Sequence, residues 1–256
     1  MTLLAMDVGN SQTVVGVFEG QVLTHHWRLS TEARRTPDEL ALQLRGLLEL
    51  AGLSLPKSII GVVISSVVPS LTDSLRDMTE RYFRFPPIIV GPGIRTGMAI
   101  RMDNPREVGA DRLVNALAAF HEYGGPGIVV DFGTGTNFDV YDEGGAFIGG
   151  AIAPGVQTSM AALSARGAQL GTVALATPRH AIGRSTVEAM QSGAIYGFAG
   201  QVDRLIEAIS EELPATPVVV ATGGLASPIT RVCRRIDRYD LWLTLKGLRL
   251  VWERNA

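Results

Sequence analysis

The feature that most constrains this chain is a short pattern that occurs twice, about half a chain length apart. An apolar run ends in Asp, one apolar residue and Gly at 7–9 and again at 131–133, with the aspartates 124 positions apart in 256 residues. Each copy continues through small polar residues into a second apolar stretch, 13–18 or 138–141. A third, partial copy of the pattern lies at 217–226, where an apolar run leads into glycines. Such internal similarity predicts a duplicated fold.

The elements expected around these copies alternate between strands and helices. Short β-rich apolar runs predict strands, and apolar residues at three-and-four spacing predict amphipathic helices. The expected strands of the first half are 3–6, 13–18, 22–29, 59–65 and 88–90, and the expected helices are 36–51, 69–81 and 109–123. The cluster Gly124-Gly125-Pro126 then breaks the pattern. We therefore expect an α/β chain with domains at 1–123 and 124–256, whose C-terminal helix packs back on the first domain.

Composition excludes several classes of function. Lys plus Arg number 23 against 25 for Asp plus Glu, a formal net charge of -2, which gives no basic surplus for nucleic acid. The longest mostly apolar run, 58–68, is shorter than a membrane span, so neither a nucleic acid nor a membrane is expected as a partner. The lone Cys233 fits a reducing cytoplasm, and we expect it to be a buried or half-buried structural side chain. Lys57 and Lys246 do not follow a glycine, so nucleotide binding here would not use a P-loop.

The repeated pattern suits a phosphate held through a cation. Glycine lets the backbone turn tightly and brings amide N–H groups close to a ligand, while the aspartate adds negative charge. A carboxylate beside a phosphate is favourable when a cation lies between them. The alternative is that Asp and Gly only close a hairpin, and the duplication counts against that alternative.

Seven segments resemble the type III pantothenate kinase family in order along the chain. They are DVGNSQT (7–13), DNPREVGADRLVNALAA (103–119), VVDFGTGTNFD (129–139), GGAIAPG (149–155), GRSTVEAMQSG (183–193), TGGLA (222–226) and LTLKGLRLVWERN (243–255). The resemblance implies the fold of the acetate kinase, sugar kinase, heat-shock ATPase and actin superfamily. That fold has two ribonuclease-H-like domains, each a mixed sheet with flanking helices, and a nucleotide cleft between them.

The resemblance also implies the ATP site. The first phosphate hairpin would comprise Asp7, Val8, Gly9, Asn10, Ser11, Gln12, Thr13 and Val14. In the second copy Thr134 resembles a residue that contacts ATP, and Asp131 one that holds a monovalent cation, K⁺ or NH₄⁺. Mg²⁺ is expected to accompany the ATP.

The pantothenate site is implied by GADR, which comprises Gly109, Ala110, Asp111 and Arg112. Asp111 matches the proposed proton acceptor, and the expected helix puts it in or near a first turn, where the helix dipole favours the carboxylate. Arg112 can pair with a substrate carboxylate. The structural alternatives are a helix-start residue for Asp111 and a solvated or salt-bridged side chain for Arg112.

Thr186 resembles a threonine that reaches pantothenate from the neighbouring subunit of a homodimer. Read locally, either Ser185 or Thr186 would serve equally well as the N-cap of the helix that follows.

The chain departs from the family pattern in three places. GTGTN stands where GTATT is usual, with Gly135 and Asn137 as the substitutions, and Met102 stands where many members carry tyrosine. Ser11-Gln12 stands where Thr-Asn is common, which keeps one hydroxyl and one amide. The expected function is ATP-dependent phosphorylation of pantothenate. The alternatives are a kinase of another small hydroxy acid and a catalytically weak nucleotide-binding regulatory or accessory protein.

Overall fold

The computed structural model describes residues 2–54, 58–167, 171–224 and 226–256. The chain divides into two compact units: unit 1 comprises 1–97, 104–118 and 244–256, and unit 2 comprises 98–103 and 119–243. The C-terminal helical segment thus belongs to the first unit. The division into domains at 1–123 and 124–256 stays a prediction.

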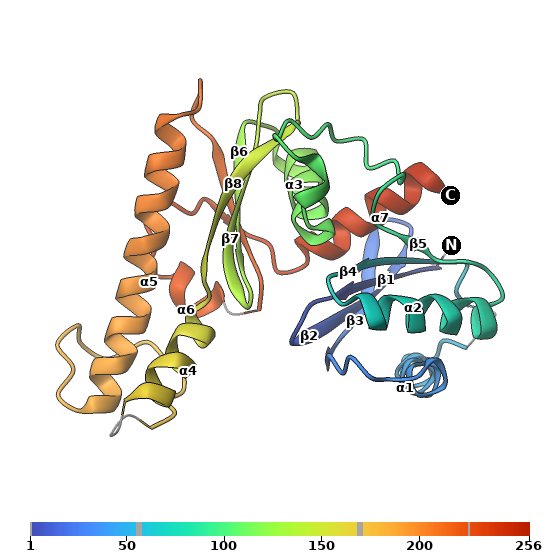
Figure 1. Ribbon diagram of the computed structural model, residues 1–256, viewed down its shortest axis with the longest axis horizontal. Coiled ribbons are helices and arrows are strands. Elements are labelled where there is room, and N and C mark those ends of the chain that lie inside the picture. The colour runs from blue at the N-terminus through green and yellow to red at the C-terminus, as the bar shows by residue number, and fades with distance from the viewer. Residues whose placement is uncertain (1, 55–57, 168–170, 225) are drawn as a thin grey trace. The chain divides into compact units, whose positions relative to one another are not determined.

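Unit 1 is built on a mixed five-stranded sheet with the order β3-β2-β1-β4-β5 (Figure 1). Its strands are β1 (Thr2–Val8), β2 (Gln12–Glu19), β3 (Val22–Ser30), β4 (Gly61–Ser66) and β5 (Ile88–Ile89). The central strand β1 runs antiparallel to β2 and parallel to β4. The carboxyl ends of β1 and β4 therefore lie at the same edge of the sheet.

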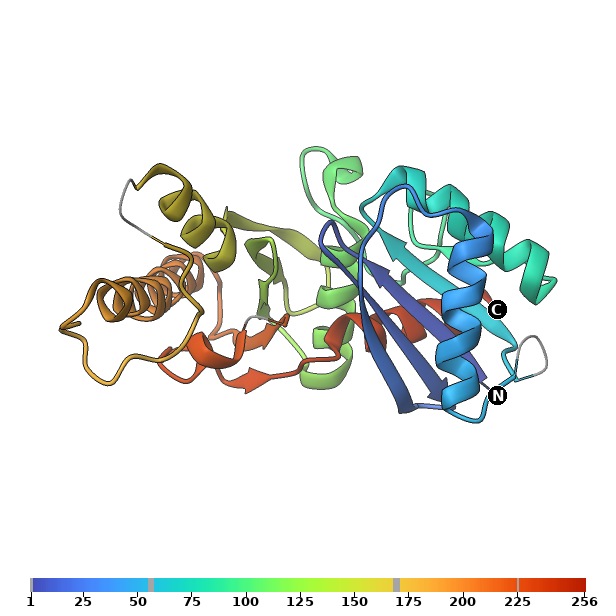
Figure 2. The ribbon, with the colours of Figure 1, turned by 90° about the horizontal axis from the view of Figure 1, so that it is seen from below.

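One face of this sheet carries α1 (Pro37–Leu50) and α2 (Pro69–Met78), and Figure 2 shows α1 lying across the strands. Helix α1 begins with a capping box, in which Thr36 accepts from the Glu39 amide and the Glu39 carboxylate accepts from the Thr36 amide. Helix α2 continues into a π-helical turn, η1 (Thr79–Phe83). Side chains from β1, β2, β4, α1 and α2 form the core of this unit.

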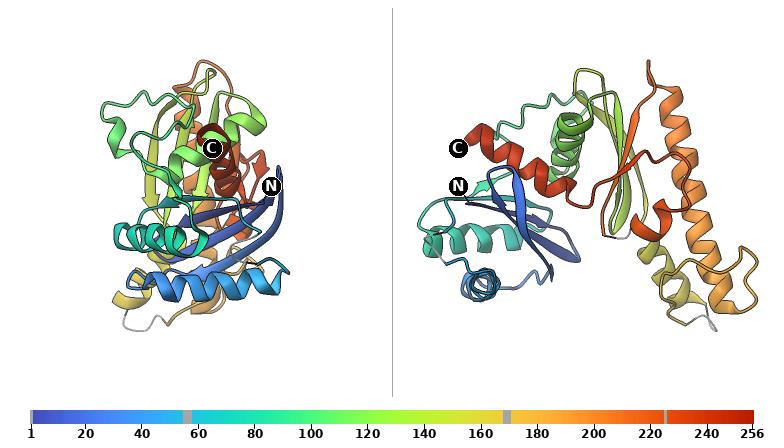
Figure 3. Two further views of the ribbon diagram at one scale, coloured as in Figure 1. Left: turned by 90° about the vertical axis from the view of Figure 1, so that its right-hand side faces the viewer. Right: turned by 180° about the vertical axis from the view of Figure 1, so that it is seen from behind.

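The opposite face of the same sheet carries α7 (Leu243–Asn255), as Figure 3 shows. Two glycines of the sheet let this helix approach closely. A Cβ at Gly16 would lie 2.6 Å from a Leu245 methyl, and one at Gly61 would lie 2.4 Å from the Trp252 indole nitrogen. The glycines therefore let Leu245 and Trp252 lie directly against the strands, because a larger residue at either position would displace these side chains.

Unit 2 repeats the sheet with the order β10-β9-β6-β7-β8. Its strands are β6 (Gly127–Phe132), β7 (Gly135–Tyr141), β8 (Phe147–Pro154), β9 (Val218–Thr222) and β10 (Arg238–Tyr239). The central β6 runs antiparallel to β7 and parallel to β9, as β1 does to β2 and β4. The two sheets therefore share one topology around the two copies of the repeated pattern.

The long helix α5 (Thr186–Glu211) covers one face of this sheet together with α4 (Val156–Arg166) and α6 (Ala226–Thr230) (Figure 1). On the other face, Phe120 near the end of α3 (Ala110–Tyr123) lies edge-on to Tyr141 of β7, with ring centroids 5.9 Å apart. Burial raises the pKa of the Tyr141 hydroxyl well above its usual value.

Most elements expected from the sequence are confirmed within a few residues. The helix expected at 69–81 changes character at its end, since η1 is wound as a π-helix. Cys233 is half-buried against the unit 2 core, as expected, and burial raises the pKa of its thiol to about 12. Among the described helices, none combines the length and apolar character that crossing a membrane requires.

Candidate active site

The first hairpin joins β1 to β2 and closes on its own backbone. The Gly9 amide donates to the Gln12 carbonyl at 3.0 Å, and Val8 lies opposite Thr13 in the antiparallel register. The turn side chains Asn10 and Ser11 are exposed. A tight turn with its backbone at the surface is what the sequence pattern predicted.

The hairpin is held from one side by the chain that follows β3. The Thr31 amide donates to the Ser11 carbonyl at 3.1 Å, and the Thr31 and Thr13 hydroxyls lie 2.9 Å apart. Thr13 is buried, so its hydroxyl binds within the protein. Val14 lies opposite Asp7 in the strand register.

Asp7 lies at the carboxyl end of the central strand and is half-buried. On β4 its parallel neighbour is Ser65, which is fully buried. The ends of adjacent parallel strands are where ligands bind in open α/β sheets. The carboxylate therefore has the position expected for a residue that helps to hold a cation or phosphate.

The second hairpin joins β6 to β7 and places Asp131 at the equivalent point. Asp131 is half-buried, lies opposite Asn137 on β7 and has Thr222 of β9 as its parallel neighbour. The turn is closed by the Gly133 amide, which donates to the Gly135 carbonyl at 2.9 Å. Thr134 is exposed at the tip.

The start of α4 supports this second hairpin from outside it. The Thr134 carbonyl accepts from the Gly155 amide at 3.1 Å and from the Thr158 hydroxyl at 2.8 Å. A Cβ at Gly155 would lie 2.3 Å from that carbonyl oxygen and 2.6 Å from that of Gly133. Only glycine fits there, because both neighbours are backbone atoms that cannot rotate away.

The turn after β9 packs against Asp131. Gly223 has φ +95, and a Cβ there would lie 2.6 Å from an Asp131 carboxylate oxygen and 2.5 Å from the Phe132 carbonyl. The Tyr239 hydroxyl of β10 donates to the Gly223 carbonyl at 3.3 Å. In the TGGLA segment Leu225 lies outside the described residues.

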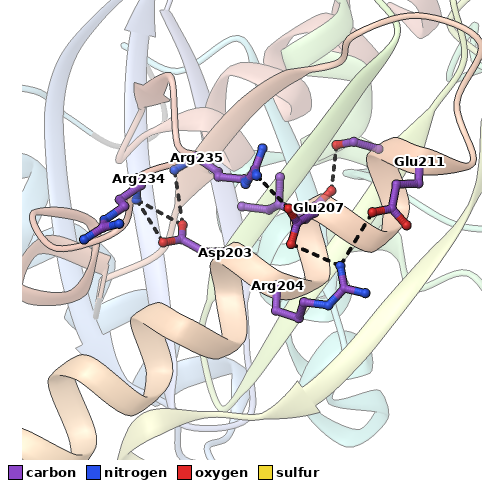
Figure 4. A network of polar contacts seen from close by, with 8 residues as sticks. Asp203, Arg204, Glu207, Glu211, Arg234 and Arg235 are labelled. Carbon is purple, nitrogen blue, oxygen red and sulfur yellow. Dashed lines mark hydrogen bonds and ion pairs between the residues drawn. The ribbon is translucent and has the colours of Figure 1, made fainter.

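The segment that leads into β10 is fixed to α5 by the polar network in Figure 4. The Asp203 carboxylate accepts from the backbone amides of Arg234 and Arg235 at 3.0 to 3.1 Å. Glu207 pairs with Arg235 at 2.8 Å and with Arg204 at 3.1 Å. The ion pairs are exposed, so each contributes little to stability. The hydrogen bonds from the two backbone amides to Asp203 are what fix the position of this segment on α5.

Asp111 is the second residue of α3, which confirms the expected first-turn position. Gly109 precedes the helix, its carbonyl accepts from the Leu113 amide at 3.1 Å, and a Cβ on it would lie 2.5 Å from an Asp111 carboxylate oxygen. The glycine therefore leaves room for the carboxylate beside the helix start. Ala110 and Arg112 are half-buried next to it.

Thr186 is the first residue of α5, and the structure decides which hydroxyl caps this helix. The Ser185 hydroxyl accepts from the Glu188 amide at 3.2 Å, so Ser185 is the N-cap. Thr186 is exposed and lines a groove of about 420 Å³ between α4 and α5. The other lining residues are mostly apolar: Ser159, Met160, Leu163, Ala189, Met190, Gly193, Ala194 and Phe198.

Asp7 and Asp131 are better suited to a cation that is also bound by phosphates than to a cation bound by protein side chains alone. Within the described residues, no group of three or more His, Cys, Asp or Glu could hold a metal ion. Mg²⁺ in nucleotide sites is typically bound by one or two carboxylates with phosphates and water. A single aspartate at the end of each central strand matches that donor set.

The sequence-predicted residues thus gather into local sets. Those at 7–14 form one hairpin, 109–112 form the start of α3, and Asp131 shares a hairpin with Thr134. Sequence reasoning missed the supports Gly155, Thr158, Gly223 and Tyr239. GGAIAPG and TGGLA were recognised as motifs, and their glycines were the signal that the backbone is approached closely at these points.

Comparisons with known proteins agree over nearly the whole chain. Residues 3–208 match the family model described as type III pantothenate kinase. A type III pantothenate kinase of Acidothermus cellulolyticus is 54% identical over 255 residues, covering 99% of both chains. One from Streptomyces griseus subsp. griseus is 53% identical over 261 residues, covering 99% of this chain and 98% of that protein.

Among solved structures, the ethanolamine utilization protein EutJ of Carboxydothermus hydrogenoformans superposes with a TM-score of 0.61. It is 14% identical, and the match covers 98% of this chain and 90% of that one, a likeness of fold alone. The two equivalent mixed sheets with flanking helices are the duplicated ribonuclease-H-like arrangement expected from the sequence. The chain belongs to the type III pantothenate kinase family.

Proposed function

We infer that this protein transfers the γ-phosphoryl group of ATP to pantothenate, giving 4'-phosphopantothenate in the first step of coenzyme A biosynthesis. The observation that carries this inference is family membership over nearly the full chain. The aspartates at the two hairpins and at the start of α3 supply the carboxylates that such a transfer needs to hold cations and to accept a proton.

In this proposal the hairpins bind the phosphates of ATP mainly through their backbones. The first hairpin contributes residues 7–14, and the second contributes Thr134. Support comes from the tight turns at Gly9 and Gly133, because a glycine turn lets amide N–H groups approach phosphate oxygens. Phosphoryl transfer depends mostly on such positioning and on charge stabilisation.

Cations would neutralise the charge that the aspartates and phosphates share. Asp7 would help to hold Mg²⁺ with ATP, and Asp131 would hold K⁺ or NH₄⁺. When bound, these ions supply positive charge beside the phosphates in a chain whose lysines are only Lys57 and Lys246.

Asp111 would accept the proton of the attacking pantothenate hydroxyl. Its support is geometric, since Asp111 lies in the first turn of α3 beside Gly109, which leaves room for its carboxylate. Arg112 beside it would pair with the pantothenate carboxylate, and Gly109 and Ala110 would shape the loop around the substrate.

We also propose a homodimer in which Thr186 reaches the pantothenate of the neighbouring subunit. Support comes from the groove between α4 and α5, where the Thr186 hydroxyl is not used as the helix cap. Leu163 in this groove and Val187 next to it are about half exposed, at 48% and 50%. A second copy would cover these side chains, and Leu163→Asp is expected to shift the mass measured by light scattering from dimer to monomer.

A coupled assay with purified protein, ATP, Mg²⁺, K⁺ and pantothenate tests the activity. Asp111→Asn is expected to lower kcat by roughly 10²- to 10⁴-fold, the usual contribution of a general base. Asp77→Asn is the matched control, because Asp77 is an exposed carboxylate on α2 outside the proposed site. No product from the wild-type protein above the Asp111→Asn background would reject the inference.

The same assay separates the alternatives. A kinase of another small hydroxy acid would turn over a different member of a substrate panel. A regulatory protein would bind ATP in calorimetry and turn over none of the panel. The cytoplasm stays the predicted location, which fractionation of the source cells would test.

A further inference from the structure

Thr158 connects α4 to the second hairpin through a bond that no sequence motif indicated. Its hydroxyl donates to the Thr134 carbonyl at 2.8 Å, across 24 positions of sequence. The Gly155 amide donates to the same oxygen at 3.1 Å. The carbonyl at the tip of the hairpin therefore has two donors from the start of one helix.

Fixing this carbonyl fixes a whole peptide unit. The Thr134 carbonyl and the Gly135 amide belong to one planar trans peptide and point in opposite directions. With the carbonyl turned toward α4, the Gly135 N–H must point away from that helix. Gly135 is also one of the two departures from the family pattern in this segment, and a glycine turn has fewer steric limits of its own.

Elsewhere α4 is held by apolar packing. Val156 is its one buried side chain, and the half-buried Met160 packs on the unit 2 core. Further along the helix, the Ser164 hydroxyl donates to the Gly171 carbonyl at 3.0 Å, well away from the hairpin. The contacts with Thr134 are therefore the polar contacts that join the first turn of α4 to the hairpin.

We propose that Thr158 is a positioning residue for ATP binding. It acts through the Thr134 carbonyl, orienting the peptide that presents the second hairpin to the nucleotide. The proposal rests on the proposed function in that Thr134 is taken to contact ATP. It assigns no direct contact between Thr158 and either substrate.

The test compares Thr158→Val, which keeps the shape and removes the hydroxyl, with Thr158→Ser, which keeps the hydroxyl. Thr158→Val is expected to raise the KM for ATP about three- to tenfold, the effect of one lost hydrogen bond, with the KM for pantothenate unchanged. Thr158→Ser is expected to restore the KM for ATP. Ser164→Ala, which removes a side chain to backbone bond from the same helix, is expected to leave both KM values as in wild type.

Calorimetry with a non-hydrolysable ATP analogue separates this proposal from the proposed function. A weaker Kd for the analogue in Thr158→Val, restored in Thr158→Ser, supports the positioning role even if pantothenate proves not to be the acceptor. An unchanged Kd overturns the role. Equal rises in both KM values, with a lowered Tm, or the same loss in Ser164→Ala, also overturn it, because a general weakening of α4 would then explain the effect.

Discussion

The two hairpins carry the same pattern of residues and are supported in different ways. Both turns close on their own backbone, and the first is held at its side by Thr31, which follows β3. The second is held at its tip by Gly155 and Thr158, and at its aspartate by Gly223. Duplication thus preserved the turn and its carboxylate, while the surrounding contacts diverged. The first hairpin should tolerate changes around it better than the second.

Between the two hairpins, the largest expected effect comes from removing the charge of the first. Asp7→Asn should lower kcat by roughly 10²- to 10³-fold, because it weakens charge stabilisation in the transition state. Asp131→Asn should act mainly on the concentration of K⁺ or NH₄⁺ needed for half-maximal activity. Steady-state assays across a series of salt concentrations distinguish the two. Identical salt profiles for both variants would remove the proposed difference in their roles.

Next in size is the exchange of glycine for alanine. Gly155→Ala should destabilise the protein by about 1 to 3 kcal/mol, since its Cβ would press on two backbone carbonyls. Gly9→Ala should cost less than about 1 kcal/mol, because its Cβ would lie 3.1 Å from the Gln12 carbonyl, a milder contact. Urea unfolding measures both. If Gly9→Ala proved the more damaging, the contrast in tolerance would be wrong.

Removing the Tyr239 hydroxyl should have a smaller effect. Tyr239→Phe deletes the hydrogen bond to the Gly223 carbonyl and leaves the ring. The lost bond should lower the free energy of unfolding by about 0.5 to 1.5 kcal/mol and leave that turn less firmly placed. Because Gly223 packs against Asp131, the variant should need more K⁺ for half-maximal activity at an unchanged KM for pantothenate. Tyr82→Phe, in which an exposed hydroxyl that binds Asp38 is lost, serves as the control.

The smallest expected effect on activity is at the side of the first hairpin. Thr31→Val removes the hydroxyl pair with Thr13 and should lower the free energy of unfolding by about 0.5 to 1.5 kcal/mol. The backbone bond from the Thr31 amide to Ser11 remains, so the KM for ATP should rise less than twofold. A tenfold rise would mean that this hairpin depends on its side-chain support as strongly as the second one does.

Much of the architecture was predictable because local signals agreed with the tertiary fold. Thr36 and Glu39 indicated the start of α1, and the strands on either side of each glycine turn were visible as apolar runs. The full length of α5 was not predictable, since Gly193, Gly197 and Gly200 within it normally disfavour a helix. Burial against the unit 2 core outweighs that preference.

The candidate site was likewise predictable from the sequence only in part. Asp111 could be placed in the first turn of α3 because helix spacing is a local property. The bonds from Gly155 and Thr158 to Thr134, and the packing of Gly223 on Asp131, join segments that are distant in sequence. No local pattern encodes such pairings, and they became visible only when the sheet brought the strand ends together.

The backbone bond from Gly9 to Gln12 also bears on how this loop can evolve. Because the path of the turn is set by main-chain atoms, the exposed side chain of Asn10 can change without altering that path. Under the proposed function, substitutions at Asn10 would adjust selectivity among nucleotides while the scaffold stays intact. A library randomised at Asn10 should therefore be rich in folded members that differ in their preferred phosphoryl donor.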